Sequence, residues 1–429
     1  MAVVVAAVVG VLAGCGGPAD VVRRPGDAAL ASAPYVPTEA PTVNPRIRDQ
    51  EAIQAVLDLA ATGFRDGDAD AVRGVLHDPD SAFGRRWTER VDHLREVPLS
   101  RYELRVDPSL PDLATGRVRA AYGDPVQVVY VVEEHALEGF DETGPAAEDL
   151  FLTMVETVDG WRIAGDRDGE PLGLVSVDHL WDHGPVVTTR DGPVLALHHP
   201  DAPTVPALLA EARQALAEAS ARWPLAWPGR VPIIVPRDEE ELAELLHVTF
   251  ELSDFIAFAT ATPVGELDEY RLTGSRIVLN PERFLDRSSE VRRRILVHEL
   301  VHVASRPTAG PLVPSWLEEG VAQAIGEQRS TTGTRLLDAL ADEGVALPSD
   351  AQFTNGGRDR IFLSYQLAWS FVDHLRDRHG TDAVARFYAA VGAGGIDGPG
   401  TTAYVVDRAA TEVFGASLAE LIAGWRAAR

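Results

Sequence analysis

The sequence predicts an α+β protein with two folded units. Two segments with helical periodicity come first, strand-like stretches follow, and from residue 194 onward strands and helices alternate before a helical end. A chain of 429 residues has room for two or three domains. Hydrophobic residues make up 45% and charged residues 24% of the chain, which is ordinary for globular protein, so we expect most of it to fold.

The charge balance argues against nucleic acid as a partner. Acidic residues outnumber basic ones by 65 to 39, which gives a formal net charge of -26. Such a charge repels a phosphate backbone or an anionic membrane surface at long range. We therefore expect no nucleic-acid binding.

The chain begins with an apolar run from Ala2 to Gly14. It is too short for the roughly 20 residues that cross a bilayer as a helix, and it is typical of a secretory signal. It ends in Leu12-Ala13-Gly14-Cys15, which resembles the lipobox of bacterial lipoproteins, and Cys15 is the only cysteine. The resemblance implies cleavage before Cys15, lipidation of Cys15, and export to the outer face of the bacterial cytoplasmic membrane. The alternative is a buried apolar segment with an incidental cysteine.

The lipobox and the changes in composition predict five segments. No basic residue precedes the apolar run, so we expect the natural start to lie upstream. The segments are a signal peptide with lipobox at 1–15, a Pro/Ala-rich tether at 16–45, a first domain at 46–170, a linker at 171–193 and a second domain at 194–429.

The first domain reads as helices followed by a strand meander. One helix carries Ile53, Val56, Leu57 and Ala60 on one face, and a shorter one follows through Leu76. The expected strands are Tyr102 to Val106, Arg117 to Tyr122, Val126 to Glu133, Leu150 to Glu156 and Trp161 to Ala164. This order and the closing "DGWRIAGDRD" resemble the NTF2-like (SnoaL-like) cone fold, in which a curved sheet wraps the N-terminal helix.

The histidines outside the second domain's motif do not predict a site. His77, His93 and His135 are scattered through the first domain, and we expect each to be a surface or a satisfied core residue. The pair His198-His199 follows a strand-like stretch, where neighbouring side chains point to opposite faces. We therefore do not expect the pair to share one ion.

The second domain opens with alternating strands and helices. A helix is expected from Val205 to Trp223 and an apolar strand from Arg230 to Pro236. Further on, Arg276 to Leu279 is expected as a strand, with Asn280 as cap and Pro281 as first residue of a helix.

The chemistry is concentrated in His298-Glu299-Leu300-Val301-His302, an HExxH motif. Ser288 or Ser289 can cap a helix that runs through it. On that helix His298 and His302 are one turn apart, so both imidazoles leave the same face with the spacing that tetrahedral zinc requires. Glu299, beside the first ligand, can take a proton from a zinc-bound water.

A second helix supplies a candidate third ligand. In Pro314-Ser315-Trp316-Leu317-Glu318-Glu319-Gly320, Ser315 and Glu318 match the capping box S-x-x-E that starts a helix. Glu319 is turned about 100° from Glu318 and is free to point inward. Gly320 permits a close helix crossing.

These two motifs, HExxH and W-L-x-E-G, resemble the gluzincin metallopeptidases, particularly the peptidase MA-like type. The resemblance covers about Val194 to Arg429 and implies one zinc ion per chain, held by His298, His302 and Glu319. Water would occupy the fourth position, and Glu299 would act as general base and then as proton donor. The thermolysin-type subgroup has an Asp four residues after the third ligand, whereas this chain has Gln323, so the partner of the histidines is unassigned.

The resemblance also implies features around the zinc. The strand before the active-site helix, here Arg276 to Leu279, would be an exposed edge that pairs with the substrate backbone, with an ordinary inner strand as the alternative. A Tyr or His of the helical lobe would stabilise the oxyanion, and Tyr365 with His374 behind it fits that position. A packed core tyrosine is the alternative.

Two functions follow from these motifs. The first is a membrane-anchored extracytoplasmic zinc metallopeptidase that hydrolyses peptide bonds through a zinc-activated water with Glu299 as general base, its first domain acting as spacer or docking module. The alternative is a catalytically inactive, zinc-holding binding lipoprotein of the cell envelope. A metal-independent hydrolase is disfavoured, because no G-x-S-x-G elbow occurs and the only cysteine belongs to the lipobox.

Overall fold

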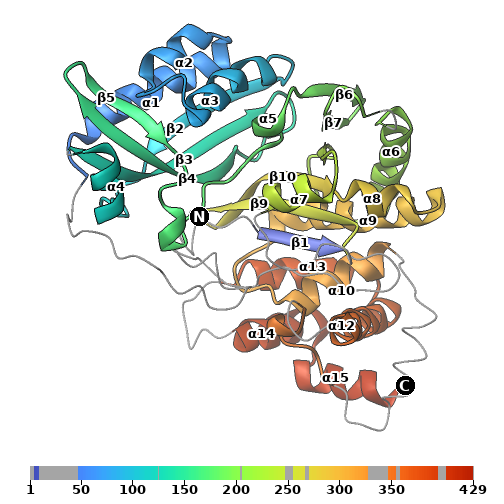
Figure 1. Ribbon diagram of the computed structural model, residues 1–429. Coiled ribbons are helices and arrows are strands. Elements are labelled where there is room, and N and C mark those ends of the chain that lie inside the picture. The colour runs from blue at the N-terminus through green and yellow to red at the C-terminus, as the bar shows by residue number, and fades with distance from the viewer. Residues whose placement is uncertain are drawn as a thin grey trace.

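The computed structural model describes residues 4–8, 47–123, 125–202, 205–246, 255–265, 270–326, 346–353, 358–394 and 402–428. Cys15 and the predicted tether at 16–45 lie outside these residues. The described chain is α+β, with a four-stranded sheet in an N-terminal unit, and a six-stranded sheet and a helical end in a C-terminal unit (Figure 1). Among the described residues, no helix combines the length and the apolar character needed to cross a membrane.

The N-terminal unit is a curled antiparallel sheet around a helix. The strand order is β2-β3-β4-β5, and α1 contacts both β2 and β5, the two edges of the sheet, so the sheet wraps the helix. Ile53, Leu57 and Phe64 of α1 are buried against it. The elements are α1 (Gln50–Asp66), α2 (Ala69–Val75), α3 (Ala82–His93), β2 (Leu99–Val106), α4 (Gly116–Tyr122), β3 (Val126–Leu137), β4 (Ala146–Thr157) and β5 (Gly160–Gly165).

Two local predictions in this unit need correction. The expected strand from Arg117 to Tyr122 is helix α4, because the Thr115 hydroxyl accepts a hydrogen bond from the amide of Val118 and caps a helix there. The sequence analysis also missed helix α3, which begins after Ser81, whose hydroxyl accepts from the amide of Gly84. The other four expected strands are confirmed, and β3 and β4 are longer than predicted.

The C-terminal unit is built on a mixed sheet of order β1-β9-β10-β8-β7-β6. Strand β7 is parallel to β8, and β8 to β10, while β6 and β9 run antiparallel to their neighbours. Helix α6 connects β7 to β8, which confirms the predicted alternation of strand and helix. The strands are β1 (Val4–Val8), β6 (Val187–Asp191), β7 (Val194–His198), β8 (Val231–Val235), β9 (Ala257–Val264) and β10 (Arg271–Leu279).

The expectation of an edge strand at Arg276 to Leu279 is wrong. Those residues belong to β10, which pairs with β8 on one side and β9 on the other. Strand β9 is the one next to β10 on the outer side, and β1 pairs antiparallel with its far edge. The sequence analysis had not predicted β9.

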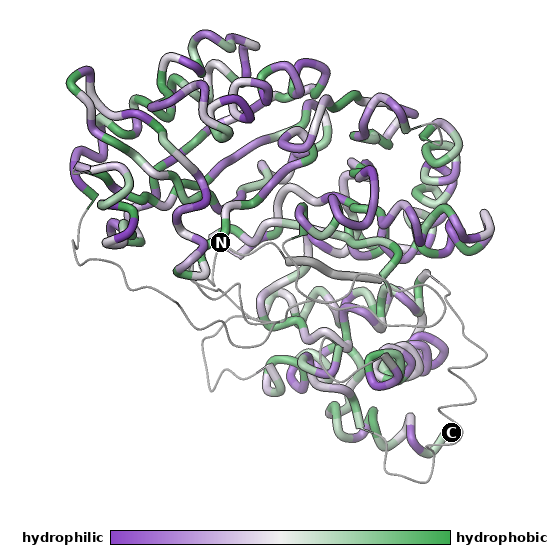
Figure 2. The backbone as a smooth tube through the Cα atoms, viewed as in Figure 1, coloured by the Kyte–Doolittle hydropathy of each residue, from purple (hydrophilic) through white to green (hydrophobic). Residues whose placement is uncertain are grey.

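Helices cover the sheet and form the C-terminal end. Helix α9 contacts β9 and β10 on one side and α6 and α10 on the other. A single apolar core runs from α6 through α9 to Trp425 in α15. Helix α12, seen nearly end-on in Figure 2, has hydrophilic and hydrophobic sides, and its Phe371 and Val372 are buried. The helices are α5 (Leu180–His183), α6 (Val205–Arg222), α7 (Glu239–Leu246), α8 (Pro281–Leu285), α9 (Ser289–Ser305), α10 (Ser315–Gly326), α12 (Arg358–His379), α13 (Thr381–Gly392), α14 (Thr402–Phe414) and α15 (Leu418–Ala427).

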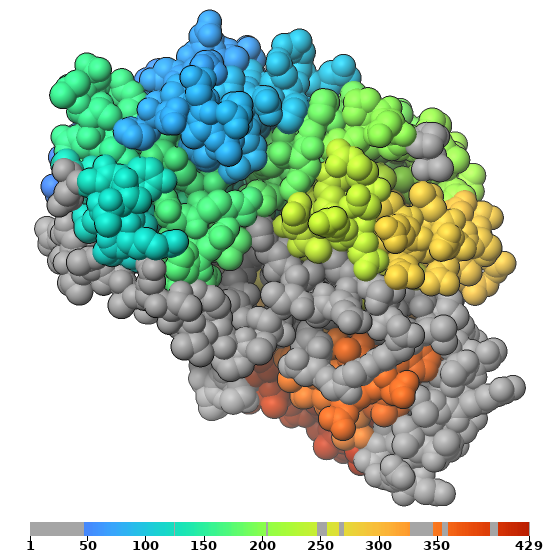
Figure 3. Space-filling model, viewed as in Figure 1, coloured from blue at the N-terminus to red at the C-terminus, as the bar shows by residue number. Residues whose placement is uncertain are grey.

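The two units are joined by a packed junction. The segment at 171–193, predicted as a linker, contributes α5 and β6, and Trp181 and Val186 extend the core of the N-terminal unit toward β7. Arg276 of β10 donates to Asp141 in the loop between β3 and β4 at 2.7 Å, and both side chains are buried. The space-filling view shows the two units in contact along their border (Figure 3).

Gly320 permits the close crossing of α10 and α12 that the sequence predicts. A methyl group at this position would lie 2.5 Å from Val372 Cγ2 and 2.7 Å from the carbonyl oxygen of Ala368, and the latter is backbone that cannot rotate away. We expect Gly320→Ala to lower the free energy of unfolding by about 1 to 3 kcal/mol, measured by urea denaturation. The matched control is Gly424→Ala in α15, where a methyl group meets no atom within 4 Å. That variant should gain about 0.5 to 1 kcal/mol, and equal effects of both substitutions would contradict the packing argument.

Candidate metal centre

Helix α9 carries the two histidines of the HExxH motif. The helix begins as predicted, because the Ser288 hydroxyl accepts from the amide of Val291. One turn of helix separates His298 from His302, and their Nε2 atoms lie 3.0 Å apart. Both side chains are fully enclosed in the core between the sheet and α10. The geometry predicted for this pair is confirmed.

Glu319 of α10 completes the group. Its Oε2 lies 3.2 Å from His302 Nε2 and 3.6 Å from His298 Nε2, and the side chain is 1% exposed. Four ligands around tetrahedral zinc, at bond lengths of about 2.1 Å, lie about 3.4 Å from one another. The three atoms therefore have the separations that a zinc ion requires.

Burial sets the protonation of the group in a way that suits a cation. Desolvation lowers the pKa of His298 and of His302 to about 4, so both imidazoles are neutral at pH 7, the form that binds metals. Desolvation raises the pKa of Glu319 to about 6, because its negative charge is poorly compensated inside the protein. A divalent cation would supply that compensation.

Glu299 lies beside the three-atom group but is not part of it. Its side chain is fully buried, and burial together with the charge of Glu319 raises its pKa well above the usual range. The charge of Arg306 and the backbone amide of Ala259 lower the pKa of Glu299, but their effect is smaller. A carboxyl group whose charged form is disfavoured in this way is suited to accept a proton.

Glu318 has a different environment from the one predicted. Helix α10 begins at Ser315 itself, so Ser315 is its first residue and not the cap of an S-x-x-E box. The carboxylate of Glu318 lies 3.5 Å from Arg306 Nη1 and 3.9 Å from Nδ1 of His302, the ring nitrogen that faces away from Glu319. Glu318 is therefore the acidic group behind His302, a position that the sequence analysis left unassigned.

Arg306 connects this arrangement to the sheet. It is 3% exposed, and its Nη2 donates to the carbonyl oxygen of Ala259 in β9 at 3.0 Å. The same guanidinium pairs with Glu318. The position of Arg306 could have been predicted from the sequence, because Arg306 follows His302 by four residues and so lies on the same face of the helix.

Tyr365 lies in the hydrophobic core of the C-terminal unit. Its ring packs edge-on against Phe353 at 4.9 Å, and its hydroxyl has no hydrogen-bond partner among the residues that the structure describes. Burial alone raises its pKa well above the usual range, with no contribution from the charged groups of the metal centre. Burial and the charges of Arg378 and His379 lower the pKa of His374, and the residues of the candidate metal centre do not contribute to this shift. The geometry corresponds to the packed-tyrosine alternative.

The neighbouring histidines His198 and His199 make separate contacts, as predicted. His198 Nε2 lies 2.9 Å from the Thr189 hydroxyl, whereas His199 Nε2 lies 2.8 Å from Glu241. The His198 ring therefore contacts β6, whereas the His199 ring contacts α7.

Comparison with known proteins adds no further assignment. The chain matches no protein-family model, no curated protein and no solved structure. The buried group of His298, His302 and Glu319 could hold a metal ion.

Proposed function

We propose that the protein is a zinc metallopeptidase, anchored through a lipid on Cys15 to the outer face of the bacterial cytoplasmic membrane. The observation that carries the proposal is the convergence of three ligand atoms on one point, with a buried carboxyl group directly beside them. This is the set that metal-assisted peptide hydrolysis requires, namely three ligands and a general base.

The residues of the site divide the chemistry between them. His298, His302 and Glu319 would hold the zinc, which supplies Lewis acidity toward water and a peptide carbonyl when it is bound. Glu299 accepts the proton of the attacking water and delivers it to the leaving amine nitrogen. Glu318 lies 3.9 Å from His302 Nδ1, which is beyond hydrogen-bond distance, so it would favour the orientation of that ring through its charge, and Arg306 pairs with Glu318 at 3.5 Å.

The substrate backbone would pair with β9. This strand contacts α9, and its outer edge already accepts an antiparallel strand, β1, with Val4 opposite Ala261 and Val8 opposite Ala257. Cleavage before Cys15 would separate the segment that contains β1 from the rest of the chain. An extended peptide could then pair with the same edge through backbone hydrogen bonds, which recognise peptides with little regard to sequence.

The test is hydrolysis of a peptide library by the lipoprotein that begins at Cys15, in a mild non-ionic detergent, because in the full chain β1 occupies the edge of β9. We expect cleavage of a subset of internally quenched peptides, loss of that activity with 1,10-phenanthroline, and recovery when zinc is added back. The recovery excludes damage by the chelator as the cause of the loss. A protein that binds zinc tightly but cleaves no peptide would support the zinc-holding binding lipoprotein instead.

A further inference from the structure

A second group of metal-ligating side chains lies inside the N-terminal unit. Glu133 and His135 are on the same face of β3, and His179 immediately precedes α5. Their exposed fractions are 0%, 5% and 9%, and one potential ligand atom from each lies within 4.8 Å of the other two. We call this group the β3 cluster. It shares no residue with the centre at His298, His302 and Glu319.

The β3 cluster contains buried polar atoms that lack partners. Glu133 Oε2 and His135 Nδ1 make no hydrogen bond to any residue that the structure describes. The same is true of Oε2 of the nearby Glu148 on β4. A buried polar atom without a partner costs about 1 to 3 kcal/mol, so three in one place point to a missing ligand.

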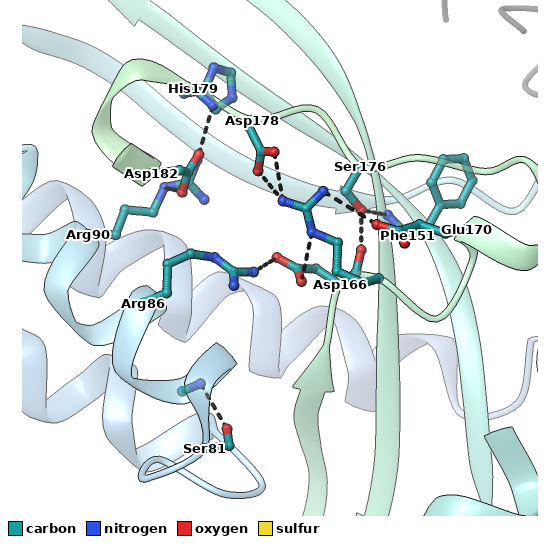
Figure 4. Close-up of polar contacts among 12 residues, drawn as sticks. Ser81, Arg86, Arg90, Phe151, Asp166, Glu170, Ser176, Asp178, His179 and Asp182 are labelled. Carbon is teal, nitrogen blue, oxygen red and sulfur yellow. Dashed lines mark hydrogen bonds and ion pairs between the residues drawn. The ribbon is translucent and has the colours of Figure 1, made fainter. Parts of the chain in front are cut away.

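The rest of the β3 cluster is already held in position. Glu133 Oε1 accepts from Arg90 Nη2 at 2.8 Å and from the Tyr102 hydroxyl at 2.7 Å, which leaves Oε2 as the available oxygen. Asp182 lies between Arg90 and the backbone amide of His179, from which it accepts at 2.8 Å (Figure 4). The contact between Asp182 and the His179 amide is also part of the capping box that starts α5, and such supporting contacts fix the ligands of metal sites.

The local charge also favours a cation. Arg90 is the cation paired with both Glu133 and Asp182, so these three groups sum to one negative charge when the histidines are neutral. Glu148 adds a second when it is ionised. The positive charge of Arg276 contributes to lowering the pKa of His135, but Arg276 is itself paired with Asp141. With Glu148 ionised, Glu133, Asp182, Glu148 and Arg90 together carry two negative charges, which a divalent ion would balance.

The geometry resembles that of the first centre. The rings of His135 and His179 lie 5.0 Å apart at 85°, and those of His298 and His302 lie 4.8 Å apart at 69°. His179 Nε2 is 3.1 Å from Glu133 Oε1, the oxygen that Arg90 and Tyr102 also contact, whereas His302 Nε2 is 3.2 Å from Glu319 Oε2. Trp181 stacks on His179 at 4.6 Å and meets His135 edge-on, which shields the group from water.

We propose that Glu133, His135 and His179 form a second metal site, for a divalent transition ion of the zinc class. Two imidazoles and one carboxylate are typical ligands for that class and unsuited to calcium or magnesium, which prefer oxygen. The ion would connect β3 to the segment that leads into α5. It would therefore stabilise the junction between the two units and take no part in hydrolysis.

The experiment is metal content per chain, measured by mass spectrometry on the full chain in detergent after equilibration with zinc and removal of the excess. We expect two zinc ions in the wild type, one in His179→Ala and one in Glu319→Ala. The double variant should retain none. The His179→Ala variant loses its contacts with Glu133 and Trp181 with or without zinc, so the difference in melting temperature from the wild type should be larger when zinc is present.

Controls separate loss of the site from loss of the fold. His183→Ala removes a histidine of α5 that pairs with Glu244 outside the cluster, and it should keep both ions. Glu133→Gln preserves the shape of the side chain and should lose one ion even if His179→Ala fails to fold. A wild-type content of one zinc that His179→Ala and Glu133→Gln both retain would overturn the proposal. Loss of that single ion in Glu319→Ala would then still support the first centre.

Discussion

Replacing Glu299 by Gln is expected to reduce peptide hydrolysis by a factor of about 10² to 10⁴ while zinc stays bound. Glu299 is not one of the three convergent ligands, so its replacement leaves His298, His302 and Glu319 unchanged. The amide has the same shape as the carboxylate but cannot accept a proton from water. The loss should therefore fall on the chemical step.

The same substitution should not destabilise the fold. Burial and the charge of Glu319 disfavour the ionised form of Glu299, which is why its pKa is raised. A neutral amide removes that unfavourable charge, so the melting temperature should stay the same or rise. The measurements are initial rates on a cleaved library peptide, zinc content and thermal unfolding of both proteins. Full hydrolytic activity in a zinc-loaded Glu299→Gln protein would exclude Glu299 as the general base.

The histidine pair of the candidate metal centre could be predicted because its geometry is local. The separation of His298 and His302 is set by one turn of a single helix, and helix α9 is specified by its cap and its apolar residues. The 100° rotation between neighbours on α10 shows only that Glu319 can point inward when Glu318 does not. Its assignment as third ligand came from the resemblance of the W-L-x-E-G motif, because its meeting with the histidines depends on the packing of α10 against α9.

The features that the sequence did not predict depend on contacts between distant segments. His135 and His179 are 44 positions apart in the sequence and meet only because the segment before α5 packs on β3. For the same reason the histidines of the first domain were read as scattered, which is wrong for His135. Strand β10 lies inside the sheet because it pairs with β9, which precedes it directly, and also with the distant strand β8, where Ile277 lies opposite Ile233.

Helix α4 shows a different limit of the sequence analysis. The residues from Arg117 to Tyr122 have a β-compatible composition, but the hydroxyl of Thr115 caps a helix at this point. Arg119, a residue of that helix, donates a hydrogen bond to the carboxylate of Asp112 at 2.7 Å. This ion pair stabilises the helix. Capping and one ion pair outweigh the weak strand preference of a short segment.

The adjacent residues Glu318 and Glu319 should respond very differently to replacement by Ala. Glu319 contributes an oxygen to the ligand group, so Glu319→Ala should lose the zinc of this centre and all detectable hydrolysis. Glu318 lies behind His302 and beside Arg306 and contributes no ligand atom. Glu318→Ala should retain the ion with an affinity about 10 to 100 times weaker.

Competition with a fluorescent zinc chelator measures both affinities on the same scale. The two variants remove the same carboxylate from neighbouring positions of α10, so the change in net charge is identical and cannot account for a difference between them. Removal of Glu318 takes away the carboxylate that pairs with Arg306. The guanidinium of Arg306 would then repel a cation held by His302, in addition to the weaker orientation of the His302 ring. If Glu318→Ala lost the ion as completely as Glu319→Ala, the ligand would have to be reassigned between the two. Equal, small losses in both would mean that neither carboxylate holds the metal.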